Sequence, residues 1–98
     1  MTDLTIDAAA SISAATAARV TRITALRERI DAIDTALIDL WQERAELSGQ
    51  VGAARIADGG TRLALARERE ILRRYRAALG ADGVPLAMLA LQAGRGRL

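Results

Sequence analysis

The sequence contains no cysteine and no histidine among its 98 residues. It therefore offers no disulfide, no zinc site built from the usual ligands, no thiol nucleophile and no imidazole acid or base. Much of hydrolase and redox chemistry is excluded. Lysine is absent as well, so all 14 basic residues are arginines. Arginine binds carboxylates bidentately where lysine offers a point charge, although GC-rich codon usage alone would also favour arginine.

The sequence also lacks a block of like charges and a long apolar run. Its 14 basic and 12 acidic residues leave a net charge of +2 and alternate along the chain, unlike a nucleic-acid-binding surface. The alanine-rich stretch at 6–18 is interrupted by Ser and Thr, and no basic residue precedes it. We expect no signal peptide, no membrane span, no nucleic-acid partner and a cytoplasmic location.

The pattern predicts an all-α protein with three helices. The long helix should begin by about residues 21–24 and continue to Asp58, where the pair Gly59-Gly60 stops it. A second helix fits 63–79. A third follows a turn at Asp82-Gly83 and ends at Ala93.

The chain also divides by composition. Residues 1–20 are rich in Ala, Ser and Thr and should form a loose or fraying helical extension. Residues 21–98 should form the helical domain.

The predicted long helix carries an apolar stripe interrupted by one charge. Arg44 occupies a stripe position, and an unpaired guanidinium in a buried seam would cost several kcal/mol of desolvation. Arg44 should therefore meet an anion. The apolar members recur at steps of three and four and are Ile23, Leu26, Ile30, Ile33, Leu37, Leu40, Leu47, Val51 and Ala54.

The length of this helix predicts a second chain. About 35 residues span roughly 50 Å, whereas a compact domain of about 100 residues has a radius of gyration of about 13 Å. Apolar cover for the far end must come from a partner, so we expect an intertwined homodimeric helical bundle. A plain two-stranded coiled coil is the alternative, but three helices with short loops favour the bundle.

Charged residues recur on the inward faces of the predicted helices. Arg55 lies eleven residues after Arg44 and points to nearly the same side. On the second helix, Glu68 occupies an apolar position of the series 64, 68, 71, 75 and 78. A buried salt bridge between Arg44 and Glu68 is the simplest interpretation. However, one carboxylate cannot neutralise Arg44, Arg55 and Arg67 together. The second interpretation is therefore an anionic ligand with more than one carboxylate.

Four short motifs give the sequence a resemblance to a known family. They are Leu26-Arg27-x-x-Ile30-Asp31-x-x-Asp34, Glu43-Arg44-x-x-Leu47, Val51-Gly52-x-x-Arg55 and Arg67-Glu68. At matching spacings the sequence is similar to the all-helical chorismate mutases of the shikimate pathway, from Ile23 to the C-terminus. The tail 94–98 and the loop 59–62 resemble a short subclass that works in complex with 3-deoxy-D-arabino-heptulosonate-7-phosphate (DAHP) synthase.

The resemblance implies a reaction that this composition permits. Chorismate, a dicarboxylate, rearranges to prephenate by an intramolecular Claisen reaction for Phe and Tyr biosynthesis, with no nucleophile, proton transfer, metal or cofactor. By match of position, Arg44 clamps a carboxylate, and Arg55 faces the ether oxygen and a carboxylate. Glu68 accepts a hydrogen bond from the ring hydroxyl, and Arg67 supports that side.

Arg27 matches a further carboxylate-binding position. It lies seventeen residues before Arg44, about 25 Å along a helix, too far for both to hold one small molecule. Arg27 should therefore complete the site of the partner chain. A solvated surface arginine is the alternative.

Two departures from the family pattern modify these expectations. Ala64 stands where many relatives have Asp, so backbone groups near Thr61 should supply part of the binding. Gly94 and Gly96 should break the third helix early and leave the tail mobile. We therefore expect weak activity alone and a higher rate with DAHP synthase.

Two other functions remain open. A related lyase splits isochorismate into salicylate and pyruvate on the same bundle. The chain could also be a non-catalytic helical interaction module with its arginines paired internally.

Overall fold

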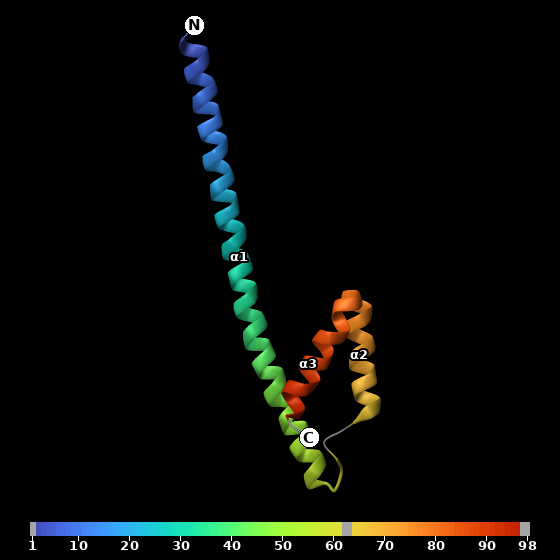
Figure 1. Cartoon of the computed structure of the whole chain (residues 1–98). Coiled ribbons are helices and arrows are strands. Elements are labelled where there is room, and N and C mark those ends of the chain that lie inside the picture. Colours follow the sequence, from blue (N-terminus) through green and yellow to red (C-terminus); the bar gives the residue numbers. More distant parts are fainter. Residues whose placement is uncertain (1, 62–63, 97–98) are drawn as a thin grey trace. The chain divides into compact units, whose positions relative to one another are not determined.

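The computed structural model describes residues 2–61 and 64–96, and these residues contain helices and no strand. The helices are α1 (Thr2–Ala57), α2 (Leu65–Leu79), the short 3-10 helix η1 (Gly80–Asp82) and α3 (Gly83–Arg95) (Figure 1). The all-α fold class and the three α-helices are therefore confirmed. The chain divides into two compact units, residues 1–37 and 38–98.

The N-terminal unit consists of residues of α1 alone. Its large apolar side chains from Ile12 onward are exposed in the single chain, and Leu37, the last of them, is 59% exposed. They include the predicted stripe residues Ile23, Leu26, Ile30 and Ile33.

Helix α1 begins much earlier than the sequence predicts, at Thr2 instead of residues 21–24. No glycine or proline precedes Gly49, and alanine, the strongest helix former, fills much of this stretch. Thr21 and Thr24 do not cap a helix start. Their hydroxyls donate to the carbonyls of Ala17 (3.0 Å) and Val20 (2.9 Å), one turn earlier in the same helix. Residues 2–20 are thus helical, and fraying of this extension stays a prediction.

Glycines end the helices where the pattern predicts. Helix α1 stops at Ala57, and Gly59 follows with a φ of 84°. Helix α2 ends at Leu79, and Gly80 follows with a φ of 69°. Both values lie in the left-handed region that glycine adopts without steric cost.

The start of α2 and the end of α3 differ from the predictions. Helix α2 begins at Leu65 instead of residue 63, which lies outside the described residues. Helix α3 continues through Gly94 and ends at Arg95, so Gly94 does not break it. The break comes at Gly96, with a φ of 72°. Arg97 and Leu98 lie outside the described residues, and the mobility of the tail stays a prediction.

The C-terminal unit has a small core between α2 and α3, which pack against each other. Its buried apolar side chains are Ile71 on α2 and Ala87 and Ala90 on α3. Gly83 lets the start of α3 lie close to the backbone of α2, because a Cβ at this position would overlap the backbone of Tyr75. Ile71 is the middle residue of the predicted inward face of α2. Its burial confirms that this part of the face points inward.

One segment, Leu65–Arg95, is long and apolar enough by composition to cross a membrane, because an 18-residue window within it has a mean hydropathy of 1.2. Gly80 divides it into two helices. Helix α3 has 13 residues, about 20 Å, whereas a bilayer core is about 30 Å thick. Helix α2 contains five arginines and two glutamates. We therefore interpret the segment as the packed helix pair of the C-terminal unit.

Candidate active site

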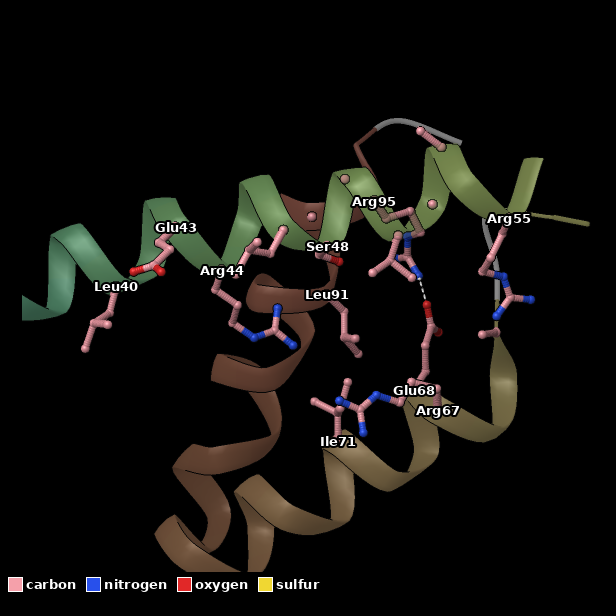
Figure 2. A pocket seen from close by; sticks show the side chains of 17 residues that line it. Leu40, Glu43, Arg44, Ser48, Arg55, Arg67, Glu68, Ile71, Leu91 and Arg95 are labelled. Atoms are coloured by element: carbon pink, nitrogen blue, oxygen red, sulfur yellow. Dashed lines mark hydrogen bonds and ion pairs between the residues drawn. The ribbon is translucent and has the colours of Figure 1, made fainter. Parts of the chain in front are cut away.

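A cavity of about 730 Å³ lies in the C-terminal unit, within the size range of small-molecule sites. Its walls come from residues 40–55 of α1, from Ala64 and the start of α2, and from the end of α3 (Figure 2). The lining includes four guanidinium groups and two carboxylates, a surplus of two positive charges. These charged residues are Arg44, Arg55, Arg67, Arg95, Glu43 and Glu68.

Arg44, the charge in the apolar stripe, extends from α1 into this cavity (Figure 2). Its Nη1 donates to the backbone carbonyl of Ala90 on α3 at 3.1 Å, and the contact is partly buried. A salt bridge between Arg44 and Glu68, one of the two interpretations of the sequence, is not present, because Glu68 is paired with Arg95 instead. A guanidinium has five N–H donors, and Arg44 uses one within the described part of the chain. The others remain for a ligand.

Arg55 lines the cavity near the end of α1. The loop that follows the helix holds its side chain in place. Its Nε donates to the carbonyl of Thr61 at 3.0 Å. This bond leaves its two terminal nitrogens for another acceptor, and Arg55 is part of the cavity lining (Figure 2). Thr61 does not belong to the cavity lining. Its backbone positions Arg55, and substrate binding by groups near Thr61 stays a prediction.

Glu68 points from α2 toward Arg95, the last residue of α3 (Figure 2). Arg95 Nη1 and Glu68 Oε1 lie 2.5 Å apart, and each side chain is 21% exposed. The pair is charge-assisted and largely shielded from water, so it is stronger than a surface ion pair. Arg95 Nε is buried and has no hydrogen-bond partner among the described residues.

Arg67 and Ala64 complete the α2 side of the lining. Arg67 Nη1 contacts Glu70 Oε2 at 3.3 Å, and these side chains are 59% and 51% exposed. Pairs this exposed contribute at most about 1 kcal/mol. An anionic ligand can therefore replace Glu70 as the partner of Arg67 at little cost.

The structure brings together five of the seven predicted site residues, Arg44, Arg55, Ala64, Arg67 and Glu68. Thr61 lies behind Arg55, and the exposed Arg27 belongs to the other unit.

Sequence reasoning missed Arg95. Only its place in the last turn of the third helix could have indicated a role, and the expected helix break at Gly94 hid that signal. Ser48 and Leu91 were missed for a simpler reason, since neither side chain is charged.

Comparison with known proteins gives the family of this chain. The family model of chorismate mutase type II matches residues 26–91. The chain belongs to the chorismate mutase type II family. Its activity is that of a chorismate mutase, an isomerase, as the sequence resemblance predicts.

Relatives of this chorismate mutase include two intracellular ones. The intracellular chorismate mutase of Mycolicibacterium smegmatis is 51% identical over 73 residues, which are 74% of this chain and 70% of that protein. The intracellular chorismate mutase of Mycobacterium tuberculosis is 49% identical over 79 residues, 81% of this chain and 74% of that protein.

A solved structure is similar as well. It is a non-covalent complex of DAHP synthase and chorismate mutase from Corynebacterium glutamicum with a bound transition state analog. The match has a TM-score of 0.76 and 36% identity, and it covers 80% of this chain and 94% of that chain.

Proposed function

We propose that the cavity converts chorismate to prephenate, that a homodimer forms the complete site, and that a DAHP synthase increases the rate. The observation that carries this proposal is the surplus of two positive charges in a cavity of about 730 Å³. Chorismate carries two carboxylates. Two anionic groups on one small molecule match that surplus.

The reaction needs positioning and electrostatics. The enolpyruvyl group must lie over the ring in a chair-like geometry, and holding two reacting ends in place can lower a barrier by about 7–11 kcal/mol. Arg44 clamps one carboxylate. Arg55 donates toward the ether oxygen, which gains negative charge as its bond to the ring breaks.

Glu68 and Arg67 act on the opposite side of the substrate. Glu68 accepts a hydrogen bond from the ring hydroxyl through the oxygen that Arg95 leaves open. Arg67 exchanges its exposed contact with Glu70 for the substrate. Nothing in this scheme requires a nucleophile or a metal, which suits a chain without Cys and His.

The second carboxylate requires Arg27 of a second chain. Arg27 lies seventeen positions before Arg44, and such a separation spans about 25 Å in an α-helix. The apolar stripe supports the same assembly, because Ile30, Ile33 and Leu37 are 54%, 42% and 59% exposed in the single chain. In a two-fold dimer each chain covers the apolar stripe of its partner and contributes its Arg27 to the partner's site.

The relatives support a DAHP synthase partner and a cytoplasmic location. The Corynebacterium glutamicum structure is a complex of the two enzymes, and the mycobacterial relatives are named intracellular. We infer the same partner for this chain.

Purified protein incubated with chorismate tests the proposal. We expect prephenate as the product, at a low rate alone and at a higher rate with the cognate DAHP synthase. No chorismate turnover in either condition would contradict the reaction. Salicylate and pyruvate from isochorismate would identify the lyase instead. Full activity alone, with no change on adding the synthase, would contradict the partner.

A further inference from the structure

Arg95 is a pocket residue to which the reaction scheme assigns no role. It ends α3, lines the cavity and pairs with Glu68 of α2 at 2.5 Å (Figure 2). We propose that Arg95 is a positioning residue, which holds the Glu68 carboxylate in the orientation needed to accept the substrate hydroxyl. This inference rests on the proposed function, since it assigns a support to one of its groups.

The backbone of α3 is built to bring Arg95 to this place. Gly94 packs directly against Ser48 of α1, and a Cβ on Gly94 would overlap the Ser48 side chain. The absence of a side chain at position 94 therefore lets α3 approach α1, and the next residue enters the cavity. Gly96 then ends the helix with a φ of 72°.

The geometry of the pair leaves Glu68 able to act. A carboxylate has two oxygens and about four lone-pair directions. Arg95 occupies Oε1, and no described residue donates to Oε2. One oxygen is thus fixed and the other is available to the ligand. A bond from a fixed guanidinium also restricts the rotamers of Glu68, so less entropy is lost when the substrate binds.

The pair is poorly arranged for stability alone. Arg95 Nε is buried without an acceptor, and an unsatisfied buried donor costs about 1–3 kcal/mol. Groups of this kind in native structures call for an explanation, and a constraint imposed by the site is one. Arg67, one residue before Glu68, does not provide the support, because it pairs with Glu70.

Steady-state kinetics of the full chain without DAHP synthase test this role. We expect Arg95→Gln and Arg95→Met to lower kcat by about 10- to 100-fold, since misplacing a reacting group is costly. KM for chorismate should stay within about three-fold of the wild type, because Arg95 does not bind the substrate itself. Arg95→Lys, which keeps a cation, should recover part of kcat.

Arg73→Gln is the matched control. It removes one arginine from the exposed surface of α2, outside the cavity lining, and should leave both constants unchanged. Arg95→Met retains the packing of the aliphatic stem, so it carries the test if Arg95→Gln does not fold.

The outcomes separate this inference from the proposed function. Wild-type protein without chorismate turnover would contradict the function itself. If the wild type turns over chorismate and a folded Arg95→Gln or Arg95→Met variant has the same kcat, the role of Arg95 is overturned and the proposed function is not. A rise in KM at constant kcat would also overturn it and make Arg95 a substrate-binding residue.

Discussion

The two ends of helix α1 follow the same spacing of apolar positions and differ in what they need. Between Ile23 and Leu37 the stripe is apolar and exposed in the single chain. Between Leu40 and Val51 it contains one arginine, Arg44, and this part of α1 lines a cavity with Arg55, α2 and α3. The first half needs apolar cover and the second needs an anion. In the proposed assembly, one helical periodicity thus provides both a dimer surface and a ligand site.

The largest expected effect concerns the charged half. Arg44→Gln should lower kcat/KM by about 100- to 1000-fold, the usual loss when a preorganised donor is removed. The helix content should not change, because Arg44 makes a single hydrogen bond to Ala90. Chorismate turnover and far-ultraviolet circular dichroism check both statements. Activity near the wild-type level would mean that Arg44 has only a structural role.

The second effect concerns the apolar half. If a partner chain covers the stripe, Leu37→Ala should lower the free energy of unfolding by about 2–5 kcal/mol, as in a protein core. Urea unfolding at several protein concentrations measures this loss and its dependence on association.

Ile38 provides the matched control for Leu37. It is 58% exposed in the single chain, against 59% for Leu37, but lies off the stripe. Ile38→Ala should change stability by at most about 0.5 kcal/mol. Equal effects of the two substitutions would remove the argument for a dimer through this stripe.

A smaller effect separates two glycines of the charged half. A Cβ on Gly94 would overlap Ser48, whereas a Cβ on Gly52 would have no neighbour within 4 Å. Gly94→Ala should therefore destabilise the chain by about 1–3 kcal/mol. Gly52→Ala should stabilise it by about 0.5–1 kcal/mol, because alanine is the better helix former. Thermal unfolding of the two variants decides, and the same sign for both would contradict the packing of α3 on α1.

The sequence predicts the parts of this structure that depend on local rules. Spacing places Arg44, Arg55 and Glu68 on inward faces, and all three line the cavity. Glycine chemistry gives the ends of α1 and α2 to within a residue. The start of α1 was missed because a helix without a breaker has no local signal for its beginning.

The ion-pair partners could not be predicted in the same way. A pair of Arg44 with Glu68 was one of two interpretations, but the approach of α3 to α1 at Gly94 places Arg95 against Glu68 instead. Which residues meet across helices depends on where the helices cross, and a pattern along one helix does not contain that information. For the same reason Gly94, which was expected to break the third helix, lies within α3 and packs against Ser48.

The central claim, that each site combines Arg44 of one chain with Arg27 of the other, is tested by mixing two inactive variants. Arg27→Ala and Arg44→Ala should each be nearly inactive as homodimers. After unfolding and refolding together in equal amounts, about half of the dimers should be mixed, each with one intact site. We expect recovery of about a quarter of the wild-type activity. No recovery, with mixed dimers shown by mass spectrometry, would contradict a shared site.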